Sequence, residues 1–507
     1  MWGKIFIRIR FSLVLFFMIV FCSVLNTTIA NSQQKYKLAM TLEEVIETAK
    51  EQSQAAMLAK HNFLINYWQF RSYKATLLPS LNLNASLGQY NRSLTALRNS
   101  ETGEYNYISN NNLTNTLSFS IDQNIALTGG RVSLITSLNR LDQFSPIDNV
   151  LFNSQPVKIN YSQPIKAYNS LKWDKIIEPK YYERAKRSYM ESIEQINISA
   201  VNLFFNVLSA RINLEMAQKD LESTELSLKI AQERYEIGTI TKNDVLSLNH
   251  RLLNAQLDIS DKQLALEMSM LSLRTFLGFN DNVDISLIIP ENTPDVQIDY
   301  EEVYARSIEN TAYMLENEIS LLNVQQEVAK AKSTNGLQAN FFATFGLTQR
   351  GDSFSGAYKN PMDQEIFGLS LSLPILDWGM GKGKVKLAQS REEVVKTQVE
   401  QSVAEYRQNV IIKVMQFNKL NAQCNISLQA DSIAKLSYNI ANERFRNGTI
   451  TVLELNTAQN DMRSSASRYI SDLGSFWQNY FTIRKLSLYD YIKGQELSAD
   501  FDKLTDN

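Results

Sequence analysis

The sequence predicts a mixed fold of strands and long helices, built as two copies of one structural unit. Two stretches indicate the duplication: the eleven residues from Ala231 read AQERYEIGTIT, and those from Ala441, 210 positions later, read ANERFRNGTIT. Seven of the eleven are identical, and Tyr235 and Phe445 are a further aromatic match. Residues 381–446 are a helical pattern without proline, which at the usual rise spans about 100 Å. An internal repeat therefore explains the length of the chain better than several separate domains.

The first thirty residues have the three parts of an export signal. Lys4, Arg8 and Arg10 form a basic region, residues 11–25 are apolar, and residues 28–30 read TIA, a small-residue cleavage site. Cleavage there would change the formal net charge from −2 to −5, which does not suit nucleic-acid binding. No later stretch reaches 18 consecutive apolar residues, so we expect no helical membrane span, and an exported chain of this kind crosses a membrane only as a closed barrel.

Two cysteines occur in the chain. Cys22 leaves a lipoprotein open as an alternative, although Phe21 is a poor residue just before an acylated cysteine. Removal of the signal would leave Cys424 as the only cysteine, and this excludes an intramolecular disulfide and a cysteine metal cluster.

Each half begins with a helical pattern, at residues 41–77 and 300–335, that leads into strands. Apolar and polar residues then alternate with a period of two, so that one strand face lies in an apolar medium and the other in water. The alternating apolar residues are Leu81, Leu83, Ala85 and Leu87, then Val157, Ile159 and Tyr161, and in the second half Ala339, Phe341, Ala343, Phe345 and Leu347, then Phe367, Leu369, Leu371 and Leu373. We expect polar loops at 91–112 and 349–365.

The first half holds an additional segment. Residues 113–122 alternate, Thr128-Gly129-Gly130 indicate a turn, and residues 131–141 alternate poorly. The sequence leaves two alternatives open: this hairpin adds two strands to the four that the repeat requires, or it lies outside the sheet.

Long helices follow the strands in each half and fold back at the repeated motif. Gly238 and Gly448 end the first helix, because a glycine just past a helix adopts the left-handed conformation without a Cβ penalty. A capping box then begins the next helix. The two boxes are Thr241 with Asp244 and Thr451 with Glu454. One helix ends and another begins within about four residues, as in a helical hairpin.

Heptad spacing predicts that these helices pack laterally as coiled coils. The recurring residues are Leu214, Leu221, Leu228 and Tyr235 in one helix and Ile426, Ile433 and Ile440 in the other. The shorter helices, 41–77 and 240–277, would match one long helix if stacked end to end. Residues 280–299 form a linker, and the polar tail from 492 is expected to be loosely ordered.

Long helices folded back through an R-[YF]-x-x-G-T-x-[TS] turn, twice per chain and after strands, resemble the TolC-like outer membrane efflux proteins. The similarity extends over nearly the whole mature chain, because QPI at 163–165 and LPI at 373–375 also lie 210 positions apart. The resemblance implies a homotrimer with one shared 12-stranded β-barrel in the membrane and a periplasmic α-barrel of antiparallel coiled-coil helices. Sharing also removes two difficulties, since four strands cannot close a barrel and long amphipathic helices cannot bury themselves alone.

On this reading the chain has five segments. They are the signal peptide 1–30, a first repeat 31–279 with its hairpin turn at 235–241, the linker 280–299, a second repeat 300–491 with its turn at 445–451, and the tail 492–507.

The resemblance implies a passive channel of a tripartite efflux or type I secretion system, in the outer membrane of a Gram-negative bacterium. Its partners would be a periplasmic membrane-fusion adaptor, an inner membrane pump of RND or ABC type and outer membrane lipids. The rival interpretation is an exported structural or adhesive coiled-coil protein with a β anchor, which would not need a duplicated strand pair. A periplasmic adaptor would need lipoyl-like or barrel domains, which are not evident. The substrate is not determined by the sequence.

We expect neither enzymatic activity nor a cofactor or metal. His61 and His250 lie on separate helical segments, whereas zinc needs three or four clustered ligands. Gly379, Gly381 and Gly383 match neither dinucleotide nor phosphate-loop spacing, and we interpret them as a strand-to-helix joint.

The resemblance assigns functions to the turns. Asp244 and Glu454 lie six positions past the turn glycine, where acids of the family ring the periplasmic aperture; the alternative is that they only cap helices, and the two roles are compatible. Where some members carry a second acid, this chain has Ser247 and Thr457. The expected adaptor-contact and turn residues, which alternatively only pack the turn, are Arg234, Tyr235, Gly238, Thr239, Thr241, Arg444, Phe445, Gly448, Thr449 and Thr451.

Overall fold

The computed structural model describes residues 36–98, 100, 103–145, 147–280, 283–290, 293–447 and 449–505. The predicted signal segment with Cys22, and the turn residue Gly448, lie outside these residues. Two compact units are distinguished, and we name them by their content. Among the described residues, the helical unit comprises 36–57, Gln195–Val296 and Phe417–Phe481, and the sheet unit comprises Leu58–Glu194, Gln297–Gln416 and 482–505.

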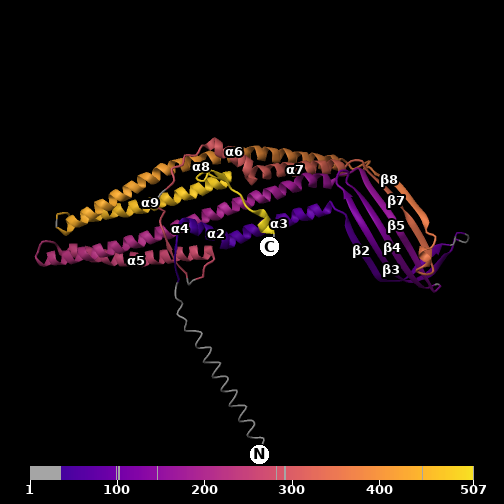
Figure 1. The fold of residues 1–507 in the computed structure, drawn as a ribbon, viewed down its shortest axis with the longest axis horizontal. Coiled ribbons are helices and arrows are strands. Elements are labelled where there is room, and N and C mark those ends of the chain that lie inside the picture. The colour runs from indigo at the N-terminus through magenta and orange to yellow at the C-terminus, as the bar shows by residue number, and fades with distance from the viewer. Residues whose placement is uncertain are drawn as a thin grey trace, which may run out of the picture. The chain divides into compact units, whose positions relative to one another are not determined.

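The two halves of the chain repeat one order of elements (Figure 1). The first half contains β1 (Tyr36–Met40), α2 (Leu42–Gln52), α3 (Gln54–Thr76), β2 (Ser80–Arg98), β3 (Tyr105–Ile125), β4 (Gly130–Ser145), β5 (Asn149–Lys166), α4 (Ser170–Glu236) and α5 (Lys242–Leu277). The second half contains β6 (Val283–Leu287), α6 (Tyr300–Asn310), α7 (Ala312–Thr334), β7 (Gln338–Gly351), the 3-10 turn η1 (Gly356–Tyr358), β8 (Met362–Ser372), α8 (Met380–Arg446), α9 (Val452–Ser487), β9 (Tyr489–Asp490), β10 (Gln495–Glu496) and α10 (Phe501–Thr505).

The long helices of the two halves have equal lengths, as a duplicated unit predicts. The helix predicted over 381–446 is confirmed by α8, and both α4 and α8 have 67 residues. Their hairpin partners α5 and α9 both have 36 residues. None of the helices in the described ranges combines the length and hydropathy that crossing a membrane requires.

Each of the helical patterns 41–77 and 300–335 is broken once, so the prediction of single helices was wrong. Ser53 separates α2 from α3, and Thr311 separates α6 from α7; both residues are buried with extended backbone. The Ala56 N–H donates to the Ser53 hydroxyl at 3.1 Å, and the Thr311 hydroxyl donates to the Ser307 carbonyl at 2.5 Å. Local bonds of this kind let a hydroxyl residue interrupt a helix without changing its apolar periodicity.

The sheet unit contains one antiparallel sheet of six strands in the order β2-β3-β4-β5-β7-β8. The additional segment 113–141 therefore lies inside the sheet, within β3 and β4. The loop predicted at 91–112 was too long, because β2 and β3 continue to pair from Asn91 opposite Asn112 to Arg98 opposite Tyr105. Strands with polar side chains can pair through their backbones alone. A prediction that depends on alternating apolar residues therefore misses the outer parts of β2 and β3. The loop predicted at 349–365 is likewise shorter, since β7 ends at Gly351 and β8 begins at Met362.

The tail is ordered through Thr505, which contradicts the expectation of a loose segment from 492. The Phe501 ring in α10 lies 5.1 Å from that of Phe63 and 6.0 Å from that of Tyr189, centroid to centroid. Contact of one aromatic ring with the buried Phe63 outweighs the polar composition around it. The predicted linker also contains a strand, β6, which pairs in parallel with β1 from Tyr36 opposite Val283 to Met40 opposite Leu287.

The core of the helical unit depends on close contact between α4 and α9. A Cβ atom on Gly474 would lie only 3.0 Å from the Phe205 side chain, so a larger residue here would push that side chain away. Buried apolar residues fill the unit, among them Val201, Phe204, Leu208, Phe417, Leu473, Phe476 and Tyr480. The largest core side chains thus lie on the helices that the sequence predicted from length and periodicity.

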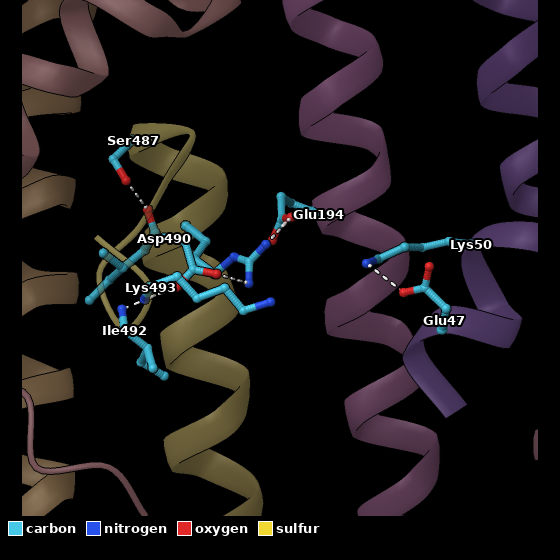
Figure 2. Close-up of polar contacts among 9 residues, drawn as sticks. Glu47, Lys50, Glu194, Ser487, Asp490, Ile492 and Lys493 are labelled. Atoms are coloured by element: carbon cyan, nitrogen blue, oxygen red, sulfur yellow. Dashed lines mark hydrogen bonds and ion pairs between the residues drawn. The ribbon is translucent and has the colours of Figure 1, made fainter. Parts of the chain in front are cut away.

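A buried ion cluster joins α4, α9 and the segment after α9 in the sheet unit. Arg484 lies 2.9 Å from Glu194 through Nη2 and 2.9 Å from Asp490 through Nη1, and both carboxylate side chains are only 4% exposed. Asp490 Oδ1 also accepts the backbone N–H groups of Ile492 at 3.1 Å and Lys493 at 3.0 Å (Figure 2). Buried charges are tolerated when they are paired and hydrogen-bonded in this way.

Replacement of Arg484 by Met should destabilise the protein strongly. The substitution keeps much of the apolar stem but leaves two buried carboxylates without their cation, which typically costs about 3–5 kcal/mol. The apparent Tm at a fixed heating rate measures the effect. Lys50→Met is the matched control, because its exposed pair with Glu47 at 3.3 Å contributes about 1 kcal/mol or less. Equal shifts for the two variants would contradict the importance of the buried cluster.

Candidate functional site at the two helical hairpin turns

The first hairpin turn ends α4 with two bonds to one carbonyl. Both the N–H and the hydroxyl of Thr239 donate to the Arg234 carbonyl oxygen, each at 2.9 Å. Gly238 has φ +77°, and an added Cβ atom would meet nothing within 4 Å. The left-handed backbone alone therefore explains why glycine occurs here.

The second turn repeats this geometry. The N–H and the hydroxyl of Thr449 both donate to the Arg444 carbonyl oxygen, again at 2.9 Å each. Thr239 and Thr449 lie 210 positions apart, and their recurrence has a local cause. Each closes the C-terminus of a helix with two hydrogen-bond donors. The predicted glycine of this turn, Gly448, lies outside the described residues.

Both predicted capping boxes are present. Asp244 Oδ2 accepts the Thr241 N–H at 2.9 Å and the Thr241 hydroxyl at 2.7 Å, while the Asp244 N–H donates to that hydroxyl at 3.3 Å. Glu454 Oε2 accepts the Thr451 N–H at 2.7 Å and hydroxyl at 2.9 Å, and the Glu454 N–H donates back at 3.3 Å. Each acid therefore begins a helix through a single carboxylate oxygen, and its charge favours the positive end of the helix dipole.

These bonds favour the ionised form of both acids. The side-chain and backbone hydrogen bonds from Thr241 lower the pKa of Asp244 below its ordinary value. The backbone and side-chain bonds from Thr451, together with the charge of Arg444, lower the pKa of Glu454. Both carboxylates are exposed and ionised at neutral pH, so the hairpin ends carry fixed negative charge.

Two open grooves flank the turns in the helical unit. One, of about 400 Å³, includes Arg234, Asp244 and Arg251 among its lining residues. The other, of about 440 Å³, includes Arg444 and Glu454. Each groove thus places an acid of a capping box near the arginine of the same motif copy, with charges of both signs at the surface.

The aromatic residues of the two motif copies differ in exposure. Phe445 is 3% exposed and lines the groove of the first hairpin together with Leu453, so it packs between the hairpins. Tyr235 is 45% exposed. Of this pair, Tyr235 is the ring that a partner can reach in this conformation.

Exposed apolar side chains form one stripe along α5 and another along α8. The α5 stripe is Leu246, Leu253, Leu257, Leu264, Met268 and Leu271, each between 51% and 66% exposed. The α8 stripe is Ile426, Ile433, Leu436 and Ile440, each at least half exposed. The two predicted heptad series thus differ in exposure. The α8 series is exposed, whereas Leu228 of the α4 series is buried within the chain. A stripe at this spacing is typical of a helix face that packs on another helix.

Sequence reasoning missed two parts of this site. Arg251 of α5 forms an ion pair with Asp220 of α4 at 3.2 Å, and no local pattern marks it because its partner lies in the preceding helix. The α5 stripe was also missed, although its spacing of three, four and seven residues is a detectable signal.

The glycines at 379, 381 and 383 form a joint at the start of α8. Across the described ranges, no group of three or more His, Cys, Asp and Glu residues is close enough to hold a metal ion. The glycines at 379, 381 and 383 lie where α8 begins, and Asp377 accepts the N–H groups of Gly379 at 2.9 Å and Gly381 at 2.7 Å. The interpretation as a strand-to-helix joint is confirmed.

The family model of the outer membrane efflux proteins matches residues 131–279 and 306–487, more than half of the chain. The chain therefore belongs to the outer membrane efflux protein family. It is accordingly a protein of the outer membrane of a Gram-negative bacterium, with a large periplasmic portion. Among curated protein sequences, none matches the chain significantly.

Solved structures share the fold at low sequence identity. The CmeC outer membrane channel of Campylobacter jejuni has a TM-score of 0.62 and 16% identity, over 91% of this chain and 88% of that chain. A membrane protein from Pseudomonas aeruginosa has a TM-score of 0.61 and 14% identity, over 90% and 92%. The outer membrane protein VceC of Vibrio cholerae has a TM-score of 0.60 and 14% identity, over 90% and 97%.

Acid should loosen the first hairpin turn through Asp244. Because folding lowers this pKa, its contribution to stability is complete above the ordinary value of 3.8 and is lost as the pH falls through the lowered value. A spin label at Ile237→Cys should keep constant mobility from pH 7 to about 5 and gain mobility below 3.8. Cys424 should not react, because burial raises the pKa of its thiol to about 12.

The same label in an Asp244→Asn background is the control. Its mobility should be higher at neutral pH and independent of pH, since no carboxylate titrates at the cap. An unchanged acid transition in that variant would contradict the assignment of the transition to Asp244.

Proposed function

We propose that three copies of this chain form a passive outer membrane channel of a tripartite efflux or type I secretion system. The proposal depends above all on apolar surface that the single chain leaves exposed, on the sheet and along α5 and α8. Two repeats, 31–279 and 300–491, joined by the segment 280–299, would each contribute strands to a shared barrel and a hairpin to a shared helical tube.

The sheet has the two faces that a wall between lipid and water needs. Directly paired residues of β2, β3, β4, β5 and β7 form an apolar row, Leu81, Ile121, Leu134, Ile159 and Phe345, each between 43% and 72% exposed. The opposite face carries a polar row of paired residues, Ser80, Asp122, Ser133, Asn160 and Thr344. Alternation of lipid-facing and lumen-facing residues is typical of membrane strands. Outer membrane lipids would therefore cover the apolar row.

The two exposed stripes support assembly along the helices. The α5 and α8 stripes both expose large aliphatic side chains at helical spacing, so each would bury its face against the neighbouring chain. In a closed threefold assembly, every chain would bury its α5 and α8 stripes in the same way.

The turn acids would form the periplasmic aperture. With three chains, Asp244 and Glu454 supply six carboxylates around one axis, and such rings attract cations. Capping uses a single oxygen of each carboxylate, so the other remains available for a cation or a neighbouring helix. Opening would then shift the hairpins against one another, as in an iris.

The hairpin ends would also dock the periplasmic adaptor. Tyr235 is exposed there, and the neighbouring Arg234 and Arg444 supply positive charge at the grooves. Energy would come from an RND or ABC pump in the inner membrane, coupled through the adaptor. An exported adhesive stalk is the second candidate, and it would show no ion conductance.

Removal of the turn acids should change ion flow. Planar-bilayer recordings of the Asp244→Ala/Glu454→Ala protein should show a higher single-channel conductance or a weaker block by divalent cations. Glu233→Ala/Glu443→Ala is the matched control, because it removes two exposed acids from equivalent positions of the same hairpins without touching a cap. Unchanged conductance and block in the first variant would reduce Asp244 and Glu454 to helix caps, and absence of any conductance in the unaltered protein would favour a stalk.

A charge in the α5 stripe should prevent assembly. Leu264→Arg places a cation where the neighbouring chain would bury an aliphatic side chain, so native mass spectrometry in detergent should show monomer in place of trimer. Gln263→Arg adds the same charge one residue away, at an exposed position outside the stripe, and should leave the trimer intact. A stable Leu264→Arg trimer would show that α5 is not an interface.

A further inference from the structure

The hairpin formed by β3 and β4 is built into the sheet by its backbone pairing. β3 pairs with β2 from Ser80 opposite Asp122 to Arg98 opposite Tyr105, and with β4 from Ile125 opposite Gly130 outward. β4 then pairs with β5 along most of its length. Removal of the hairpin would leave a gap of two strands between β2 and β5, because they have no direct pairing in the described sheet.

Side chains fasten the hairpin turn to the ends of the neighbouring helices. Gln123 donates to the Leu77 carbonyl at 3.0 Å, and Asn124 donates to the Thr76 carbonyl at 3.2 Å, so the end of β3 is held at the end of α3. Asn169, just before α4, donates to the Ala126 carbonyl at 3.1 Å.

The turn glycines fit closely against this anchor. A Cβ atom on Gly129 would lie 2.9 Å from the Asn169 side chain, and Gly129 already has φ +74°. Gln163 of β5 donates to the Thr128 carbonyl at 3.0 Å. A hairpin that lay outside the sheet would need none of these contacts.

Both faces of the sheet continue across the hairpin without a break. Ile121 and Leu134 connect Leu81 to Ile159 in the apolar row. On the polar face Asp122 accepts hydrogen bonds from Asn82 of β2 at 2.9 Å and from Ser133 of β4. At these two rows β3 and β4 therefore have the same lipid-facing and water-facing pattern as the strands that the repeat requires, although Ile135 of β4 lies opposite Ser120 on the polar face.

We propose that each chain contributes six strands to the barrel, so that the trimer closes an 18-stranded barrel in place of the 12-stranded one that the resemblance implies. This inference rests on the trimeric channel proposed above. The free edges are β2 and β8, which run in opposite directions at the two ends of the strand order, so β2 of one chain pairs with β8 of the next. An open edge in the hydrocarbon region would leave backbone groups without hydrogen bonds, and closure removes it.

The consequence is a wider outlet. Barrel diameter grows nearly in proportion to strand number, so 18 strands give about one and a half times the diameter of 12. Barrels of 16–18 strands enclose an aqueous channel. Selection by size then falls to the hairpin turns, and the outlet admits cargo that is bulkier than a 12-stranded barrel passes.

Disulfide cross-linking of the full chain in outer membranes tests the closure. Ser370→Cys on β8 is combined in turn with Ser80→Cys, Asn84→Cys or Ser86→Cys on β2, which share the polar face and cover the possible stagger of the closing pair. At least one combination should give covalent dimers and trimers on oxidation that disappear on reduction. Each single-cysteine variant is a control and also accounts for Cys424.

Two other pairs would overturn the six-stranded wall. An interchain link between Ser137→Cys on β4 and Ser370→Cys would make β4 the edge, with β2 and β3 outside the barrel. An intrachain link between Asn84→Cys on β2 and Lys158→Cys on β5 would show that the hairpin has left the sheet. No link from β2 to β8 in an intact trimer would overturn the proposal as well.

Two measurements distinguish a failure of this inference from a failure of the proposed function: the mass of the native assembly and the number of strands in its barrel. A threefold particle whose cryo-electron microscopy reconstruction shows 18 strands supports both, and one with 12 strands overturns only the wider barrel. A monomeric protein without conductance overturns the channel itself.

Discussion

Apolar surface that one chain cannot cover is the constraint on which the rest of this structure depends. Aliphatic side chains line α5 and α8 at helical spacing, and a second set crosses five strands of the sheet, and all of them are half exposed or nearly so. Water disfavours such surface roughly in proportion to its area. In the proposed trimer, a neighbouring chain would cover the helix stripes and lipid would cover the strand row, and the family membership of the chain is consistent with this division.

Polar caps make the long hairpins possible at their exposed ends. Each turn satisfies the last carbonyl of one helix with a threonine and the first N–H groups of the next with a capping box. These are local interactions, so they require neither the core nor a partner. The same residues that hold the turn also leave a carboxylate and an arginine at the surface, so the proposed aperture and adaptor contact would use residues that also fold the turn.

In the sheet unit, single side chains hold segments of the chain in place at three points. The Arg484 cation holds two buried carboxylates together, and one of them, Asp490, arranges the backbone that follows α9. Phe501 then fastens the end of the tail against Phe63. At the sheet, four polar side chains hold the turn of the inserted hairpin to its neighbours. The contacts of Arg484 with Glu194, of Phe501 with Phe63 and of the hairpin turn with its neighbours join residues that are far apart in the sequence.

Local rules were enough to predict the long helices, the turns and their caps, because these depend on residues within one helical turn of each other, and the repeat followed from comparison of the sequence with itself. The glycine at 238 and the boxes at Thr241 and Thr451 are examples. The place of the 113–141 segment depended on strand pairing, which joins distant residues and is indifferent to side-chain polarity, as Asn91 opposite Asn112 shows. The ordered tail and the burial of Phe445 but not Tyr235 were likewise decided by tertiary packing. Sequence periodicity shows which face of a helix or strand is apolar, but only the tertiary structure determines which residues or solvent that face contacts.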